Sequence, residues 1–322
     1  MYRRALLSTG VAVATTGCLG PTLGLGSDCP RGTELRLRPT TADDTAAGAS
    51  DPVDTLSPPE RDAIAAAIGG DRPTMWVPES SSAPFSGSAS VADDGTYYAV
   101  EAPVVSTTRR TGYGAELDAG PDVDTGGRAV AFEDLRDVDR LALFALLGYP
   151  NDRVMRRFAA GRAISVGGTL AYPDDGTQAR SELVPEPAYD VIRIRGHDFR
   201  FRLVETRDAA IETRRIAVDP VATSADEFAA RIYDRRGIVL DGDLPPEQRD
   251  IVEAAVEDGY DECAPYSEPY ADLQRTLGRP VTRVTDDGDG VATTPTGEMP
   301  ERVDYANYEN EWYFVQLSEY VV

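Results

Sequence analysis

Apolar residues recur at helical spacing in three segments of the chain, 54–68, 131–147 and 241–256. Each segment has an acidic residue and a leucine, then residues suited to a helix start, then an apolar period. In the third segment Ile251, Ala254 and Ala255 follow the i, i+3, i+4 spacing of one helix face. The proline pairs at 58–59 and 245–246 suit a first helical turn, whose N–H groups have no intrahelical partner. The pattern therefore predicts three helices.

Aromatic-rich segments at 95–105, 197–206 and 311–321 follow these helices and predict strands. The alternation in "FRFRLVE" predicts a half-buried strand from which Arg200 and Arg202 point outward. Shorter apolar runs at 128–132 and 237–240 predict strands in front of the second and third helices. "VEAPVVSTTRR" at 100–110 resembles "VETRDAAIETRR" at 204–215, with a spacing that predicts a strand, a turn and a returning strand.

These likenesses indicate an internal repeat, and its irregular gaps argue against a solenoid. The predicted fold class is α+β, with two or three small modules, each a helix packed on a mainly antiparallel sheet. We place the modules at 31–125, 126–225 and 226–322, with boundaries in the segments 111–127 and 219–228.

The first 17 residues have the layout of a signal peptide, with Arg3 and Arg4 before a short run of small apolar residues. That run is too short to span a bilayer as a helix. The paired arginines resemble a twin-arginine export signal, and Thr16-Gly17-Cys18 resembles a lipobox. This likeness implies cleavage before Cys18, its lipidation, and a flexible tether over 18–30. The alternative is an N-terminal helix that buries Cys18.

Charge adds a second indication of where the protein works. The formal net charge is −23, and all 32 basic residues are arginine. Such charge repels itself in dilute salt, whereas at molar salt the Debye length is about 3 Å. The composition excludes nucleic acid as a partner because no basic domain is present. With its amino-terminal signal, the chain resembles a lipoprotein of halophilic archaea. The resemblance implies a location on the extracellular face of the cell membrane, with the lipid as the membrane contact.

Two further cysteines, Cys29 and Cys263, remain if Cys18 carries lipid. In an oxidising compartment this pair predicts one disulfide, which would stabilise the fold by about 4–5 kcal/mol at most. The alternative is two separate buried thiols.

We find no catalytic motif, cofactor motif or metal-binding motif. His197 is the only histidine and precedes Asp198, but no G-x-S-x-G sequence supplies a nucleophile, so a solvated turn histidine is favoured. One histidine and dispersed thiols cannot form a zinc site. The segment 285–290 resembles the start of a calcium-binding loop. Threonines, however, fall on its first and twelfth ligand positions, where carboxylates are needed.

One cluster of basic residues is a candidate anion-binding site. Arg153, Arg156 and Arg157 fall on one face of a predicted helix, and the guanidinium fork suits carboxylates and phosphates. The alternative, which we favour, is local compensation of nearby acidic residues. The aromatic residues near the carboxyl terminus could stack on sugars, although packing within a strand is favoured; these are Tyr305, Tyr308, Trp312, Tyr313 and Tyr320.

The sequence thus favours a non-enzymatic surface lipoprotein that binds or organises an envelope protein or glycan. Two alternatives stay open. One is a secreted hydrolase of envelope glycans, which needs two facing carboxylates. The other is a solute-binding lipoprotein, which needs a pocket.

Overall fold

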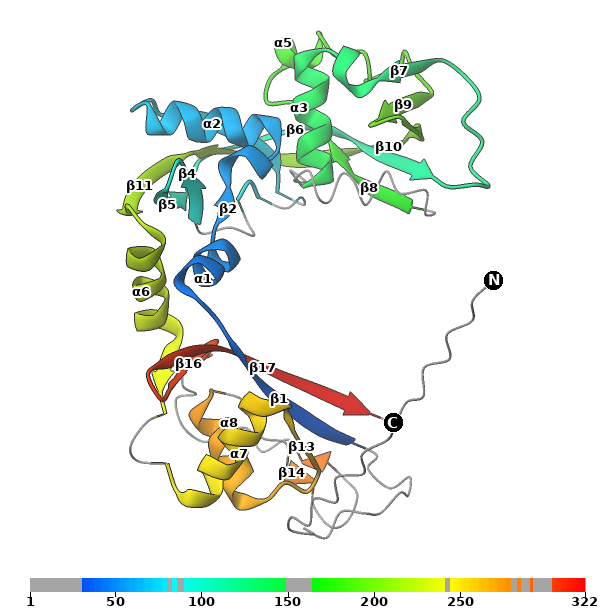
Figure 1. Cartoon of the computed structure of the whole chain (residues 1–322). Helices are drawn as coiled ribbons and strands as arrows, with labels where there is room; N and C mark the ends of the chain where they lie inside the picture. The colour runs from blue at the N-terminus through cyan, green and yellow to red at the C-terminus, as the bar shows by residue number, and fades with distance from the viewer. Residues whose placement is uncertain are drawn as a thin grey trace, which may run out of the picture. The chain divides into compact units, whose positions relative to one another are not determined.

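The computed structural model describes residues 31–79, 81, 83–85, 90–148, 164–240, 244–278, 283–284, 290–291 and 303–321 (Figure 1). It confirms the α+β class, with helices packed on three mainly antiparallel sheets. The chain divides into two compact units. One comprises 1–37, 244–300 and 315–322, and the other comprises 38–243 and 301–314. Strands β1 (Arg31–Pro39) and β17 (Glu311–Val321) each contribute to both units.

The sheet around the second predicted helix has the strand order β7-β9-β10-β6-β8. Strand β7 (Ala129–Ala131) leads through a short 3₁₀ turn into α3 (Asp137–Leu147), which returns to β8 (Ile164–Leu170) at the far edge of the sheet. Strand β9 (Val191–Ile194) then pairs in parallel with β7, and β10 (His197–Arg215) turns back between β9 and β6 (Val104–Ala119).

The third predicted helix lies in the chain between two strands of another sheet. That sheet repeats the same order as β12-β16-β17-β1-β13. Here β12 (Gly237–Val239) precedes α7 (Pro246–Glu257), and β13 (Tyr260–Cys263) follows it and pairs with β1. Strand β16 (Tyr305–Tyr308) pairs in parallel with β12 and antiparallel with β17. The helix α8 (Glu268–Thr276) is additional, as is the small ladder of β14 (Arg283–Val284) and β15 (Gly290–Val291).

The first predicted helix follows a strand of a third sheet, which has a similar strand order. Strand β2 (Asp51–Pro52) precedes α2 (Pro58–Ile68), and the sheet order is β11-β5-β4-β2. Strand β4 (Ser90–Asp93) is parallel to β2, and β5 (Thr96–Glu101) lies between β4 and β11 (Ala217–Ala222). Strand β3 (Thr74–Pro78), which follows α2, pairs with the last residues of β10, and β10 runs on into β11 after Ile216.

The same tight turn joins the last two strands of each repeat. The turn residues are Asp94-Gly95, Arg195-Gly196 and Glu309-Asn310, and all six have positive φ between 45° and 82°. Two central residues with positive φ define the type I′ turn, whose twist matches that of a hairpin. Shared strand order, shared parallel pair and shared turn support the prediction of an internal repeat, and we refer to the three units as the first, second and third modules.

The first and third modules have exchanged one strand. In the second module, the long strand β6 immediately precedes the module that it completes. By contrast, β1 precedes the first module but lies in the third sheet, whereas β11 precedes the third module but lies in the first sheet. The predicted ranges 31–125, 126–225 and 226–322 therefore do not each contain a whole sheet.

A pair of helices follows the exchanged strands. Helix α1 (Ala42–Ala49) follows β1, and α6 (Ala225–Arg236) follows β11. The two helices pack together, and the Thr45 hydroxyl hydrogen-bonds the Tyr233 hydroxyl at 2.8 Å. Module 2 has no such helix between β6 and β7.

Two local expectations from the sequence differ from the structure. The segment 204–215 has no turn, because β10 continues through it with a bulge between Leu203 and Glu205. The glycine-rich boundary at 111–127 is partly strand, since Gly112 and Gly114 lie within β6. The alternation in β10 is confirmed: Phe199 and Phe201 are buried, whereas Arg200 and Arg202 are exposed.

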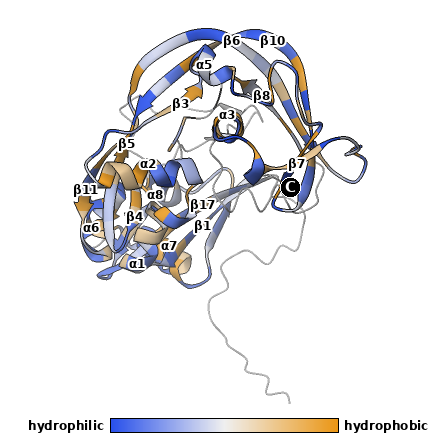
Figure 2. Ribbon diagram, turned by 90° about the horizontal axis from the view of Figure 1, so that it is seen from above, coloured by the Kyte–Doolittle hydropathy of each residue, from blue (hydrophilic) through white to orange (hydrophobic). Residues whose placement is uncertain are grey.

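A core of buried hydrophobic residues lies between helices α2 and α3 and the sheets beside them. Helix α3 buries Leu143 completely, together with Ala142 and Ala145, and Ile192 of β9 and Phe199 of β10 belong to the same cluster. Figure 2 shows hydrophobic and hydrophilic residues alternating along β6 and β10, as expected for strands with one covered face.

Candidate functional site

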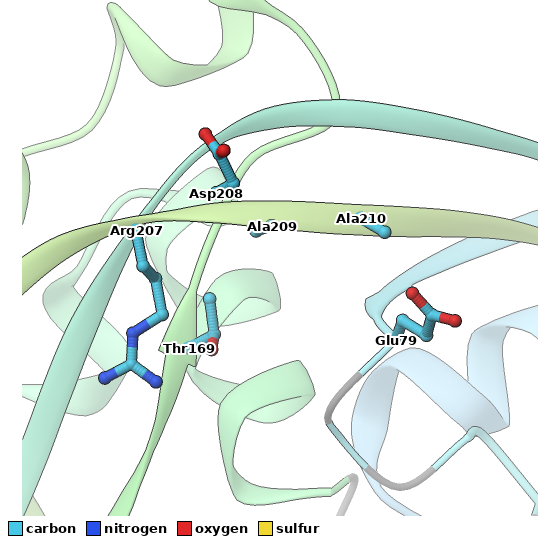
Figure 3. A pocket seen from close by; sticks show the side chains of 6 residues that line it. All are labelled: Glu79, Thr169, Arg207, Asp208, Ala209 and Ala210. Atoms are coloured by element: carbon cyan, nitrogen blue, oxygen red, sulfur yellow. The ribbon is translucent and has the colours of Figure 1, made fainter.

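A groove crosses β10 close to its bulge. It has a volume of about 350 Å³ and is lined by Glu79, Thr169 and the β10 residues Arg207, Asp208, Ala209 and Ala210. Figure 3 shows Arg207 and Glu79 at its two ends, with Thr169 and Ala209 between them. We call it the Arg207–Glu79 groove. All of its lining residues lie within the unit formed by 38–243 and 301–314.

The floor of the groove is built from small residues. Ala209 is buried, and Gly112 and Gly114 of β6 lie on the same face of the sheet as Arg207 and Glu205, their register partners. A Cβ atom at Gly112 would lie 2.8 Å from both Ala209 Cβ and Thr169 Cγ2. Such separations are closer than van der Waals contact, so glycine at 112 is what allows Thr169 and Ala209 to meet across β6.

Arg207 forms one end of the groove. Its guanidinium lies across β6, where a Cβ atom at Gly114 would come within 2.5 Å of Nη2. The same Nη2 is 2.9 Å from Oε1 of Glu205, with 43% of the Arg207 side chain and 63% of the Glu205 side chain exposed. An ion pair this exposed contributes little to stability, so its partners can be exchanged at small cost.

Glu79 forms the other end. It directly follows β3, and its backbone N–H donates to the carbonyl oxygen of Ala210 at 2.8 Å. That bond fixes the residue beside β10. Its side chain makes no ion pair or hydrogen bond with the described part of the chain.

Between these two ends, no described strand pairs with the edge of β10 that faces away from β6. On the side away from β6, β10 pairs with β9 up to Arg200 and with β3 from Ile211 onward. Because Ala210 directs its carbonyl toward β3, the backbone N–H and C=O of Asp208 point to the same side. No described strand pairs with Asp208 on that side. The Asp208 carboxylate itself points away from Arg207 and Thr169 (Figure 3).

A second guanidinium lies on the same sheet face. Arg110 is the register partner of Ala209, and its Nη1 donates to Oδ1 of Asp175 at 2.7 Å. Its Nε atom is buried and makes no hydrogen bond to any residue that the structure describes. Both guanidiniums near the groove, those of Arg207 and Arg110, are thus paired with exposed carboxylates.

A second group of polar side chains is the buried cluster of Asp139, Tyr172 and Ser181. Asp139 Oδ1 accepts from the Tyr172 hydroxyl at 2.7 Å and the Ser181 hydroxyl at 2.6 Å, and Oδ2 accepts from the backbone N–H of Glu182 at 2.9 Å. Burial, reinforced by the nearby Asp139 charge, raises the pKa of Tyr172. Asp139 is fully buried, and the cluster contains no imidazole to act as a base, so it holds segment 181–184 in place.

Several residues singled out in the sequence fall outside the described residues. These are Cys18, Cys29, Arg153, Arg156 and Arg157, so lipidation and the anion site stay predictions. Cys263 is the only cysteine among the described residues, and it is disulfide-bonded. It pairs in register with Gly32, three residues after Cys29. The Cys29–Cys263 bridge stays a prediction that this register favours.

Other predicted candidates lie at the surface or in the core. His197 is exposed at the start of β10, and Asp198 pairs instead with Arg193 at 2.7 Å. Tyr305, Tyr308 and Tyr313 are buried, as favoured over a sugar-stacking platform. The acidic loop 285–290 lies outside the described residues except for Gly290. Within the described ranges, no cluster of three or more His, Cys, Asp or Glu side chains could hold a metal ion, and no helix is long and apolar enough to cross a membrane.

No local pattern predicts the groove, because its residues come from β8, β10 and the position directly after β3. The glycines at 112 and 114 were the available signal, since paired small residues within a strand indicate close approach by another group. Comparison with known proteins adds no assignment: no family model, curated protein or solved structure matches the chain.

Proposed function

We propose that this protein is a non-enzymatic binding protein of the outer face of the cell membrane, held there by lipid on Cys18. We further propose that the Arg207–Glu79 groove is its binding site and that the ligand is a small solute. This choice takes up the solute-binding alternative and joins it to the predicted surface location.

The groove is the observation that carries the proposal. Ligand sites are concave, have volumes of roughly 300–1,000 Å³, and combine apolar walls with a few polar groups. The Arg207–Glu79 groove, at about 350 Å³, lies at the small end of that range. Its lining includes the small residues Ala209 and Ala210, and the charged residues Arg207 and Glu79 stand at its ends.

The arrangement of carboxylates supports binding over hydrolysis. Glycoside cleavage by the common mechanisms needs two carboxyl groups that flank one bond. Of the two acidic residues that line the groove, Glu79 stands at one end and Asp208 directs its carboxylate to the opposite side of β10 (Figure 3). The groove thus offers one carboxylate to a ligand.

Binding can be tested by thermal unfolding and calorimetry in molar NaCl, with a panel of small charged and neutral solutes. We expect at least one solute to raise the unfolding temperature of the wild-type protein. The variant Ala209→Leu fills the floor of the groove and should abolish that shift. Because the larger side chain could also disturb packing, its circular dichroism spectrum and unfolding temperature are compared first, and Thr169→Val serves as a near-isosteric second variant. A shift that survives in both variants would place the binding elsewhere.

The anchor is tested separately by the intact mass of protein extracted from native membranes. A chain that starts at Cys18 and carries lipid is the expected result, with no alkylated thiol until a reductant is added. A full-length chain with three alkylatable thiols would contradict both the anchor and the Cys29–Cys263 bridge.

A further inference from the structure

We infer that one edge of strand β6 is an interaction surface for a second copy of this chain. The surface consists of residues 104–111 on the side of β6 that faces away from β10, and we call it the β6 edge. It pairs in antiparallel fashion with the same edge of the partner, so that two sheets join into one. The inference goes beyond the proposed function and does not depend on it, because no residue of the β6 edge lines the Arg207–Glu79 groove.

The β6 edge has no partner strand among the described residues. Strand β8 pairs with β6 from Tyr113 onward, and β4 pairs with β5 up to Ala99, which leaves the segment between them unpaired on this side. No backbone group of another described loop or cap bonds to residues 104–111 either. An edge strand of this length presents a row of N–H and C=O groups to solvent, which makes it a template for pairing with another chain.

The pairing of β6 with β10 identifies the backbone groups that face outward. The carbonyl oxygen of Ala210 accepts a hydrogen bond from Glu79 on the far side of β10. Ala210 and its register partner Arg109 therefore form a non-hydrogen-bonded pair. It follows that the N–H and C=O of Arg109 point away from β10. By alternation along the strand, those of Thr107 and Thr111 point to the same side.

The side chains along the β6 edge suit a paired strand. All residues from 104 to 111 are exposed except Arg110, which is half-buried. Val104 and Val105 are each 42% exposed, and the other residues of the segment are serine, threonine and arginine. Valine and threonine favour strands, and no proline interrupts the segment. The segment is therefore able to extend a sheet.

Charge favours a second copy of the chain as the partner. Residues 102–115 contain no acidic residue, although the protein has a net charge of −23, and they include Arg109 and Arg110. Two acidic copies therefore repel each other less at this edge than at faces that carry carboxylates. Glu101 is exposed just beyond the other end of the edge. Antiparallel pairing places the arginines of each copy alongside the partner's Glu101, whereas parallel pairing would place arginine beside arginine.

Antiparallel pairing of two identical edges is a two-fold arrangement, in which one patch meets itself. When it is centred near Thr107, the two β6 strands lie in the middle of a continuous sheet and one β10 strand flanks each of them. The arginine stems of one copy then cover Val104 and Val105 of the other. Because the pairing uses both edges, the assembly closes as a dimer and does not grow into a filament.

Sedimentation equilibrium of the purified protein in molar NaCl measures the association, because the long-range repulsion between acidic copies is then screened. We expect a monomer–dimer equilibrium at micromolar concentrations. Thr107→Pro removes an outward N–H and leaves the bonds to β10 in place. Since two symmetric hydrogen bonds are lost, the dissociation constant should rise by about tenfold or more. Thr107→Val is the matched control, because it keeps the N–H and the preference for a strand, and it should leave the dimer unchanged.

Amide hydrogen exchange of the wild-type protein locates the interface without any variant. Raising the protein concentration should slow exchange at Thr107, Arg109 and Thr111, whose N–H groups face outward. Exchange at Ser106 and Thr108 should change little, because their N–H groups already face β10. This alternation along one strand is specific to edge pairing.

Three results would overturn the inference. The first is a protein that stays monomeric at all concentrations measured. The second is a dimer that Thr107→Pro leaves intact, with an unchanged circular dichroism spectrum. The third is protection from exchange that is confined to other residues, and this result decides the matter if Thr107→Pro does not fold. Solute binding tests the groove separately, so either proposal can fail while the other stands.

Discussion

Thr41 and Ser224 cap two helices that begin with nearly the same sequence, and each helix follows a strand that lies in the other module's sheet. The Thr41 hydroxyl accepts from the backbone N–H of Asp44 at 3.1 Å, and the Ser224 hydroxyl accepts from that of Glu227 at 3.2 Å. Ala-Asp-Asp follows the first cap and Ala-Asp-Glu follows the second. These equivalent caps mark the points at which β1 and β11 leave their own modules.

This exchange of strands predicts that β11 can be cross-linked to β5 within one chain. Val218 and Val100 are register partners, so cysteines at both positions lie close enough for a disulfide. We expect Val100→Cys/Val218→Cys to oxidise to a monomer, and the bridge to raise the free energy of unfolding by about 4 kcal/mol at most. Intact mass, with and without a reductant, checks the bond. Two free thiols, with Val218→Cys alone as the control, would contradict the exchanged arrangement.

The buried Asp139 cluster predicts a large cost for a small change. In Asp139→Asn, an amide nitrogen must replace one of the two oxygens that accept hydrogen bonds, so at least one donor loses its charged acceptor. We expect the free energy of unfolding to fall by about 2 kcal/mol. Denaturant titration measures the change. Asp137→Asn, which is highly exposed on the same helix, should alter it by less than about 0.5 kcal/mol.

Glu60 predicts a dependence of stability on pH. Burial, the largest cause, raises the pKa of this carboxyl, and it outweighs the bonds from the Ser57 hydroxyl and the Phe85 backbone N–H. The nearby Asp51 charge acts in the same direction, and burial raises the pKa of Asp51 as well. A raised folded-state pKa means that the unfolded chain loses its proton first. Stability from Glu60 is therefore full below the unfolded pKa and is lost as pH rises through the folded pKa.

The variant Glu60→Gln should remove this dependence. A glutamine keeps an oxygen for Phe85, and its amide can donate to the Ser57 hydroxyl. We expect the variant to unfold at a higher temperature than the wild type at neutral pH and to lose that advantage in acid. Equal unfolding temperatures at neutral pH would show that Glu60 is ionised in the folded protein at no cost.

Glu205 predicts a gain of affinity. Because it occupies the Arg207 guanidinium, Glu205→Gln should leave that group more available to a ligand carboxylate. An exposed pair of this kind is worth up to about 1 kcal/mol, so the affinity for a solute that carries a carboxylate should rise on the order of threefold. Calorimetry in molar NaCl measures it, and weaker binding would mean that Glu205 itself contacts the ligand.

Local patterns predicted the helices α2, α3 and α7 and the α+β class, because helix periodicity and proline at a first turn act within a few residues. The helices α1, α6 and α8 were not predicted. Local patterns predicted neither β1 nor the sheet that it joins, because pairing with distant strands decides which sheet a segment enters. The turn expected within 204–215 was wrong because cross-strand pairing with β6 and β3 extends β10 through a bulge. The groove escaped prediction for the same reason: only pairing brings Thr169, Gly112 and Ala209 together.

The most direct test of the Arg207–Glu79 groove is a nuclear magnetic resonance titration of the protein in molar salt with the solute that most raises its unfolding temperature. The account predicts that the amide signals that shift will be those of residues 207–210, Gly112, Gly114 and Thr169, and that Arg207→Gln will suppress the shifts. Shifts confined to other residues would contradict the account. The absence of any shift in the wild-type protein at millimolar ligand would also contradict it.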